Sequence, residues 1–238
     1  MSDHQARQLA QTLCDATEQV LLPTIPAWTR SHDVERLGSG QLPRPTLRVG
    51  GGRATHHRFD RHSGEHSITF GIKMVADKLA PADCGSWLSA REILGRGYFE
   101  GQISAANLLA HTGCHEFAHF LQTITGGRRR GSVHNRAFYR ILDTLHRQQI
   151  AEDFRLGLLD LVRSRGLALS VHVVRMPDPD ASLARFSPGD LVFFGRGNTL
   201  EGRVTRINRK TCSVQGVGRC KGMRYRVSPQ FLLHQERL

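Results

Sequence analysis

The sequence lacks the features that mark membrane-spanning and secreted proteins. It has no run of roughly eighteen or more apolar residues, the length that a membrane-spanning helix needs. Residues 1–19 are polar and lack the apolar segment of a secretory signal peptide. The cysteines are odd in number and have no zinc-ribbon or disulfide-framework spacing. We therefore expect a cytoplasmic protein, associated with the nucleoid if its source is bacterial.

Acidic residues are scarce relative to basic ones. The chain has 33 Lys and Arg against 21 Asp and Glu, which gives a formal net charge of +12. From Phe186 onward ten Lys or Arg stand against three Asp or Glu, so more than half of the net charge lies in the last fifth of the chain. Basic surfaces favour anionic partners, and nucleic acid is the commonest of these inside a cell. We expect the C-terminal part to contact such a partner.

The pattern of apolar residues predicts an α+β domain followed by a small β module. Strict alternation predicts a strand at 67–75, and 171–174 is a second candidate strand. Pro23 and Pro26 are expected to end the first helix, and Ser104 is expected to cap the second. Helical spacing predicts helices at 3–22, 104–123, 133–150 and 153–165.

A stretch rich in Pro and Asp, 176–187, is predicted to be a linker. It divides a domain at 1–175 from a module at 188–238. The module has a different pattern, because short strands separated by turns replace the helices. These strands are expected at 191–194, 202–207, 212–217 and 224–227.

One motif indicates a metal site, and this is His115-Glu116-Phe117-Ala118-His119. Residues four apart lie on one face of a helix, so both imidazoles can reach the same tetrahedral Zn²⁺. The intervening Glu116 then projects beside the metal, where it can take a proton from a zinc-bound water. The motif therefore predicts a zinc centre with Glu116 as its general base.

A catalytic zinc needs a third protein ligand and leaves its fourth position to water. Thr125 occupies the position that a short metzincin spacing would give to a histidine. His134, just before the next predicted helix, is the preferred candidate, because a helix–loop–helix hairpin can bring it back over the first two ligands. A downstream carboxylate, Asp143 or Glu152, is the alternative, and in that case His134 is a polar loop residue.

The segment His115-Glu116-Phe117-Ala118-His119-Phe120-Leu121, a basic loop with Gly, and His134-Asn135-Arg136-Ala137-Phe138 together resemble the SprT-like metallopeptidases, the group that includes Spartan. The resemblance covers roughly residues 65–150. It implies a zincin-like domain in which zinc is bound by His115, His119 and His134. It also implies that Glu116 is the general base of a zinc metalloendopeptidase.

Other residues near the motif have competing interpretations. His111 lies one turn before His115 and is expected to support the site rather than to bind zinc. Tyr139 is either an oxyanion-stabilising phenol or a half-exposed helix residue. The strand at 67–75 is predicted to be the edge strand along which an extended peptide pairs. A second metal site or, more simply, a solvated loop is expected for the cluster His56, His57, His62 and His66.

Residues 186–194 and 201–211 resemble the small β-barrels of KOW or Tudor type, which implies a nucleic-acid or protein partner. Phe193 or Tyr225 can stack on bases, and the basic loop Arg128–Arg130 can extend the surface toward the metal site. A basic face that docks a protein is the alternative. The side chains expected to neutralise phosphates are Arg203, Arg206, Arg209, Lys210, Arg219, Lys221, Arg224 and Arg226.

The sequence thus predicts a SprT-like zinc endopeptidase that acts on proteins associated with DNA. Two alternatives stay open. The first is a metallopeptidase with a soluble protein substrate and a barrel that recruits protein. The second is a nucleic-acid-binding protein with a structural metal site, which a closed fourth ligand would indicate.

Overall fold

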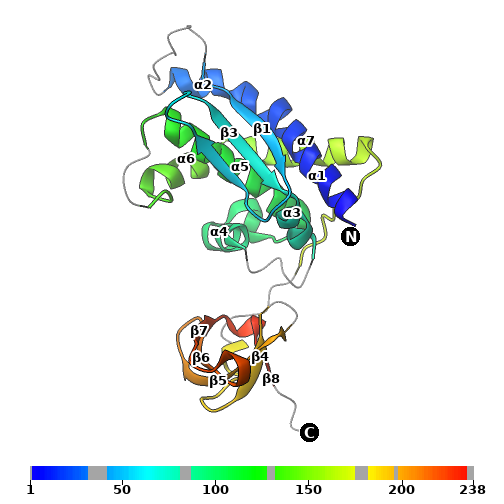
Figure 1. Cartoon of the computed structure of the whole chain (residues 1–238). Helices are drawn as coiled ribbons and strands as arrows, with labels where there is room; N and C mark the ends of the chain where they lie inside the picture. The colour runs from blue at the N-terminus through cyan, green and yellow to red at the C-terminus, as the bar shows by residue number, and fades with distance from the viewer. Residues whose placement is uncertain are drawn as a thin grey trace. The chain divides into compact units, whose positions relative to one another are not determined.

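The computed structural model describes residues 2–31, 42–80, 87–127, 132–174, 182–195 and 198–234. The chain divides into two compact units, Met1–Val174 and Arg175–Leu238, and each is described by itself (Figure 1). Both units contain β-sheet, and the first adds helices, so the chain is a mixed α+β protein. The basic loop Arg128–Arg130 and residues 176–181 of the predicted linker lie outside the described residues.

The first helical region is longer than its prolines predict. Helix α1 (Asp3–Ala16) begins at Ser2, whose side chain accepts from the backbone of Gln5 in a capping box. The chain then continues through a π-helical turn (Thr17–Leu21), a 3-10 turn (Leu22–Thr24) and α2 (Ile25–Arg30). Pro23 and Pro26 occupy the first turns of the two following helices, where a missing N–H has no consequence. The first helix, with its π-helical turn, thus ends at Leu21, next to its predicted end at residue 22, but separate helical turns that contain the two prolines follow it.

A three-stranded sheet forms one layer of this unit. Its strands are β1 (Pro45–Gly50), β2 (His56–Phe59) and β3 (His66–Gly71), in the order β1-β3-β2. Strand β3 pairs in parallel with β1 and antiparallel with β2. The predicted edge strand is therefore the central one, and β2 is the edge strand adjacent to α5.

The predicted strand 67–75 is correct only as far as Gly71. Helix α3 (Ile72–Leu79) begins there, because Ile72, Val75 and Leu79 also repeat at helical spacing within the apparent alternation. Gly71 lies where the strand ends and the helix begins. Only glycine fits at this position, because a Cβ would lie 2.4 Å from the carbonyl oxygen of Gly52. The candidate strand 171–174 has no strand structure, and Val174 donates instead to the carbonyl of Ile103 at 2.7 Å.

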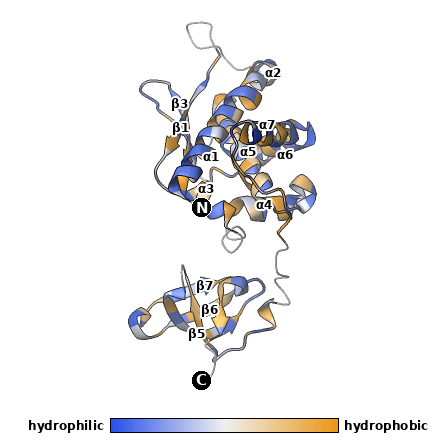
Figure 2. Cartoon of the chain, turned by 90° about the vertical axis from the view of Figure 1, so that its right-hand side faces the viewer, coloured by the Kyte–Doolittle hydropathy of each residue, from blue (hydrophilic) through white to orange (hydrophobic). Residues whose placement is uncertain are grey.

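Helix α5 (Ala105–Ile124) is the centre of the unit and is almost entirely buried. Ser104 caps it as predicted, accepting from the backbone N–H of Asn107 at 3.1 Å. Helices α6 (Arg136–Arg147) and α7 (Ile150–Ser164) pack against α5. Figure 2 shows hydrophobic residues gathered around α5 and hydrophilic residues along the outward side of α1. A further helix, α4 (Leu88–Arg96), is absent from the sequence prediction.

The second unit is a strongly curved antiparallel sheet with its strands in the order β7-β6-β5-β4-β8. The ring of Phe194 in β4 lies 4.9 Å from that of Tyr225 in β7, although two strands separate them, so the sheet curls around its core. In the described part of this unit β7 and β8 do not pair, so closure into the predicted barrel is not seen. The strands are β4 (Leu191–Phe194), β5 (Leu200–Ile207), β6 (Cys212–Gly216), β7 (Arg224–Val227) and β8 (Leu233–His234).

The predicted boundary at residue 188 is too late. Leu183 and Phe186, assigned to the linker, are buried in the core of the second unit together with Val192 and Phe194. They belong to the sheet unit because their apolar side chains fill its core.

Candidate metal centre

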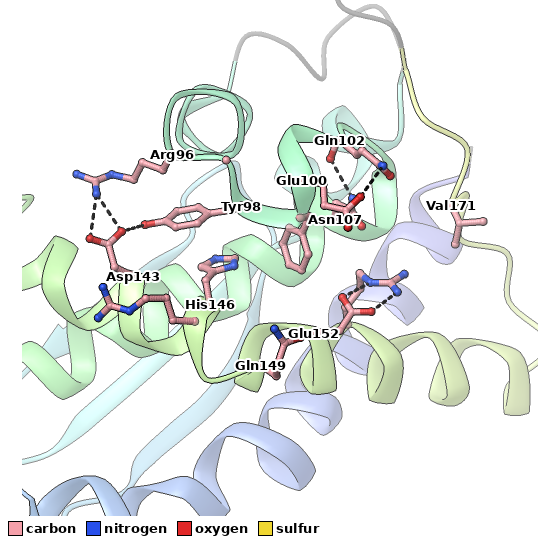
Figure 3. A pocket seen from close by; sticks show the side chains of 14 residues that line it. Arg96, Tyr98, Glu100, Gln102, Asn107, Asp143, His146, Gln149, Glu152 and Val171 are labelled. Carbon is pink, nitrogen blue, oxygen red and sulfur yellow. Dashed lines mark hydrogen bonds and ion pairs between the residues drawn. The ribbon is translucent and has the colours of Figure 1, made fainter.

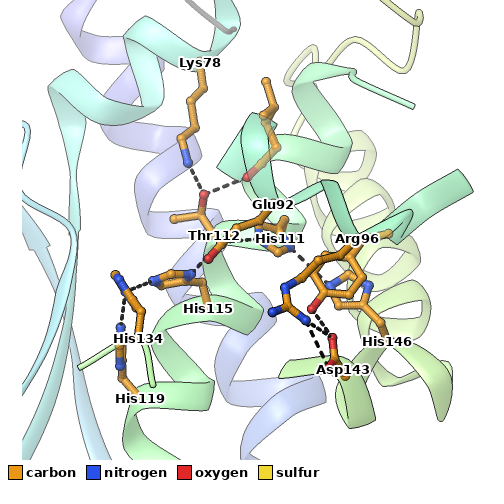
Figure 4. Close-up of polar contacts among 12 residues, drawn as sticks. Lys78, Glu92, Arg96, His111, Thr112, His115, His119, His134, Asp143 and His146 are labelled. Atoms are coloured by element: carbon orange, nitrogen blue, oxygen red, sulfur yellow. Dashed lines mark hydrogen bonds and ion pairs between the residues drawn. The ribbon is translucent and has the colours of Figure 1, made fainter. Parts of the chain in front are cut away.

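Three histidines converge at one point of the first unit (Figure 4). His115 and His119 lie one turn apart on α5, and His134 immediately precedes the N-cap of α6. The Nε2 atom of His134 lies 3.1 Å from Nε2 of His115 and 3.1 Å from Nε2 of His119. The three residues form a group able to hold a metal ion. The helix–loop–helix hairpin predicted from the sequence brings them together.

The donor set fits a zinc ion. Imidazole nitrogens bind Zn²⁺ at about 2.0–2.1 Å, which places two tetrahedral ligands about 3.3 Å apart. Burial, followed by the neighbouring His115 and His134, lowers the pKa of His119 to about 3. Burial also lowers the pKa of His134. At neutral pH these rings are therefore neutral, and a cation among their lone pairs would remove the repulsion between the converging nitrogens.

Glu92, on α4, holds the first of these histidines in place. Its Oε2 atom lies 2.9 Å from Nδ1 of His115 and 2.8 Å from Nε2 of His111. A proton on Nδ1 of His115 leaves Nε2 free for the metal, and a carboxylate partner makes the imidazole a stronger ligand. The sequence prediction missed Glu92, because residues 88–96 have no clear apolar stripe and α4 itself was not predicted. The sequence around Glu92 gives no direct indication that this carboxylate contacts His115, which lies 23 residues further along the chain.

His111 has the supporting position that its spacing predicts. It is completely buried, and its Nδ1 lies 3.2 Å from Nε2 of His146. Glu92, His111 and His115 form a second group that could hold a metal ion. This group uses Nδ1 of His115 and is enclosed by protein, so it is a hydrogen-bonded support of the first group.

The two alternative carboxylate ligands lie elsewhere, around a separate cavity of about 780 Å³ (Figure 3). Asp143 accepts from Arg96 at 2.9 Å and from the hydroxyl of Tyr98 at 2.6 Å. Glu152 accepts from Arg155 at 2.8 Å. Both carboxylates are engaged in local ion pairs, so His134 is the residue that joins the histidine group.

Glu116 is held beside the histidines by the edge strand. Its Oε2 atom accepts the backbone N–H of His57, in β2, at 2.8 Å. Burial raises the pKa of the Glu116 carboxyl, while His115, the His57 N–H and Lys78 oppose that rise. Glu116 therefore lies in the kind of environment that brings a carboxyl pKa toward that of a general base.

A cavity of about 410 Å³ opens over this group. Its wall includes the three histidines, Glu116 and residues from β2, α3, and the start of α4. Phe138, fully buried, packs its ring 4.9 Å from that of His115 and 4.3 Å from that of His119. The ring positions of the ligands are thus fixed by packing as well as by hydrogen bonds.

The remaining candidates of the first unit have different surroundings. Tyr139 lies outside the lining of the metal cavity, with the guanidinium of Arg96 3.8 Å from its ring, so the oxyanion role is not supported. In the histidine cluster, His57 and His66 are buried and their Nε2 and Nδ1 atoms lie 3.0 Å apart. His56 and His62 are exposed. The cluster is therefore half core and half surface, and not a uniformly solvated loop.

Four predicted phosphate contacts form a regular arrangement on the second unit. In the strand register Arg203, Gln215 and Arg224 make one row across β5, β6 and β7, and Arg206, Ser213 and Arg226 make the next. The arginines are exposed and lie at the corners of a rectangle of roughly 7 by 10 Å at the backbone. We call this set, Arg203, Arg206, Arg224 and Arg226, the arginine face.

The other predicted contacts flank the arginine face. Arg209 and Lys210 are exposed in the β5–β6 turn, while Arg219 and Lys221 are exposed in the β6–β7 connection. Phe193 is half-buried on the outer side of β4, next to exposed Leu233 of β8. Tyr225 is also half-buried and packs against the core, so of the two predicted stacking residues Phe193 is the one on the outer side of the sheet.

Comparisons with protein-family models, curated proteins and solved structures find no match to this chain. Among the helices that the structure describes, none is long and apolar enough to cross a membrane. The function is therefore argued from the site.

Proposed function

We propose that the chain is a zinc-dependent endopeptidase of SprT-like type that acts on proteins associated with DNA. The observation that carries this proposal is the position of Glu116. Its carboxylate is held at 2.8 Å by the His57 N–H, and it lines the same cavity as the three converging imidazoles. A metal-binding group with an adjacent, buried carboxylate is an arrangement suited to metal-assisted peptide hydrolysis.

His115, His119 and His134 would hold the zinc, and Glu92 would orient His115 through Nδ1. When bound, zinc would polarise the scissile carbonyl and lower the pKa of the attacking water. Glu116 would accept the proton at its carboxylate and later deliver it to the leaving amine. The cavity wall formed by β2 would position an extended peptide, since β2 is an edge strand.

The geometry of the histidine group supports a catalytic metal site rather than a structural one. Within the described residues the group contains three donors and no fourth protein ligand, and it faces a cavity. Structural zinc sites are normally closed by four protein ligands, whereas catalytic sites keep one position for water or substrate. The arrangement therefore supports hydrolysis over the alternative of a structural site.

The arginine face supports a nucleic-acid partner for the second unit. Its four exposed guanidinium groups can each contact a phosphate, and the neighbouring Phe193 offers a ring for base stacking. A protein that recognises an acidic partner would use the same charges, so the nucleic acid has to be tested directly.

The deciding experiment is cleavage of casein or histone by the zinc-loaded protein, with and without single-stranded DNA. Glu116→Gln serves as the control, because it removes the base and leaves all three imidazoles. Cleavage that requires DNA and is lost in the control supports the whole proposal. Cleavage that ignores DNA keeps the peptidase and removes the DNA tether. No cleavage by protein that retains zinc contradicts the enzymatic function.

A further inference from the structure

A buried lysine lies in the wall of the metal cavity. Lys78, on α3, is 4% exposed and donates to the hydroxyl of Thr112. Its Nζ atom is 5.3 Å from the centre of the Trp87 ring. An ammonium has three N–H donors, and among the described residues Thr112 is the acceptor for one of them. No carboxylate of the described residues forms an ion pair with it, which is costly for a buried charge.

Ser89 brings a second buried polar group to the same wall. It is 6% exposed, and its hydroxyl has no hydrogen-bond partner within the described residues. Both Ser89 and Lys78 line the metal cavity. A buried hydroxyl without a partner is uncommon in folded proteins and calls for a ligand or water that completes its hydrogen bonding.

The first turn of α4 lies at this point. Trp87 is the N-cap residue, and its side chain caps none of the free N–H groups. The first N–H groups of a helix have no acceptor within the helix, and the helix dipole favours an anion there. Trp87, Leu88 and Ser89 all line the cavity. Lys78, Ser89 and this turn therefore present N–H and O–H donors and a positive charge toward one region.

The balance of charge in the cavity points to an anionic ligand. Glu116 is the acidic residue of the lining, and it is engaged with the His57 N–H. Arg53, the other basic residue of the lining apart from its histidines, is paired with Asp77 at 2.8 Å. Burial lowers the pKa of Lys78 to about 7, although Glu116 and Glu92 oppose that shift. A carboxylate at this point would give the ammonium its missing partner and favour its charged form.

We propose that Lys78, Ser89 and the first turn of α4 form a carboxylate-binding subsite beside the metal, which selects substrates with a carboxylate near the scissile bond. This inference rests on the proposed peptidase function for its substrate. The carboxylate comes either from an Asp or Glu side chain or from the C-terminus of the chain being cleaved. These sources share one chemistry, and the test separates them.

Binding is measured first, by the fluorescence of Trp87, one of two tryptophans in the chain. Four probes are used: N-acetylglutamic acid α-amide and its glutamine counterpart for the side chain, and N-acetylleucine and its amide for the terminus. At least one carboxylate probe should saturate the signal and bind about tenfold more tightly than its amide partner. Equal binding within both pairs would overturn the proposal.

Lys78→Met should remove the preference for carboxylate, whereas Lys73→Met, on the exposed side of the same helix, should retain it. Ser89→Ala should weaken carboxylate binding about threefold or more and provides the readout if Lys78→Met does not fold. Carboxylate binding that survives both substitutions at the subsite would contradict its assignment.

Cleavage of peptides that differ by one Glu or Gln then separates the two proposals. Cleavage without a preference for Glu or for a free C-terminus, unchanged in Lys78→Met, would leave the peptidase in place and refute the subsite. Selective carboxylate binding by a protein that cleaves no peptide would refute the peptidase and support the subsite.

Discussion

The backbone N–H of His57 donates to Oε2 of Glu116 at 2.8 Å, so the edge strand of the sheet holds the carboxylate beside the histidines. In the antiparallel register His57 faces Ile68. Because the His57 N–H is used by Glu116, this is a non-hydrogen-bonded pair, and the alternation of an antiparallel ladder assigns the bonds between β2 and β3 to the flanking pairs. The N–H of His57 is therefore directed away from the sheet. The strand uses it to position the proposed general base.

Two substitutions of His57 distinguish the role of its backbone N–H from that of its side chain. His57→Pro removes the N–H, and the ladder to β3 retains its own bonds because they come from the neighbouring residues. We expect His57→Pro to lower kcat about 10–100-fold relative to His57→Ala, since only the proline variant loses the bond to Glu116. Steady-state peptide cleavage with both variants, matched for zinc content, measures the difference. Equal rates would show that the bond has no role in catalysis.

Glu92→Gln should weaken zinc binding about 10–100-fold, because it removes the charge that orients His115 and strengthens its ring as a ligand. Competition with a chromogenic chelator measures the affinity. Glu100→Gln is the charge-matched control, since Glu100 is exposed beside the other cavity and its printed contact is with Gln102 rather than with the three histidines. An unchanged affinity in Glu92→Gln would contradict the supporting role of this carboxylate.

Gly113 and Gly95 provide opposite tests of packing. A Cβ at Gly113 would lie 2.3 Å from Cε1 of the fully buried Phe154, whereas a Cβ at Gly95 would meet nothing within 4 Å. Gly113→Ala should therefore lower the free energy of unfolding by about 2 kcal/mol despite the better helix propensity of alanine. Gly95→Ala, within α4, should raise it by up to about 1 kcal/mol. Urea unfolding of both variants checks the two signs.

Acid should destabilise the zinc-free protein through His66. Burial lowers the pKa of this ring to about 4, against 6.5 in an unfolded chain. Between these values the unfolded state binds a proton that the folded state does not, so stability falls as pH decreases from about 6.5 to 4. The loss from this residue is at most about 3.4 kcal/mol. His66→Phe should reduce the dependence of urea midpoints on pH in this window by its own share, and an unchanged slope would contradict the assignment.

Removal of the arginine face should lower both the affinity for single-stranded DNA and its dependence on salt. Each lost phosphate contact reduces the slope of log K against log salt by about 0.7, so changing all four residues to Gln should reduce it by about 3. Fluorescence anisotropy at several salt concentrations gives the slope. A variant with the same charge loss on exposed arginines of the first unit should bind with the wild-type slope; its sites are Arg30, Arg61, Arg140 and Arg163.

The metal centre was largely predictable because most of its geometry is local. A four-residue spacing on a helix fixes His115 and His119, and a hairpin to the next helix is enough to return His134. Asn135 accounts for the return: its side chain accepts from the N–H groups of Ala137 and Phe138 and from the amide of Gln122. The N-cap of α6 is thereby joined to α5, which places the preceding His134 over its partners.

The parts that failed depend on distant contacts. The apolar residues after Gly71 fit the two-residue period of a strand as well as the 3.6-residue period of a helix. The chain changes to a helix where the Gly52 carbonyl approaches Gly71 closely, and the sequence does not indicate this contact. The role of Glu92 depends on how α4 packs against α5, and the order β1-β3-β2 depends on a parallel pairing between strands that are not consecutive. Local patterns do not encode either arrangement.

The packing of Phe138 against the three imidazole rings has a consequence for how a metal would be exchanged at this group. Because a buried aromatic side chain and the surrounding helices set the imidazole positions, loading requires little reordering of the chain. Metal would enter and leave a scaffold that is already folded, unlike a zinc finger, which unfolds when stripped. A chelator should then abolish the proposed activity reversibly and leave the circular dichroism spectrum unchanged, so that zinc supply could switch that activity on and off while the protein stays folded.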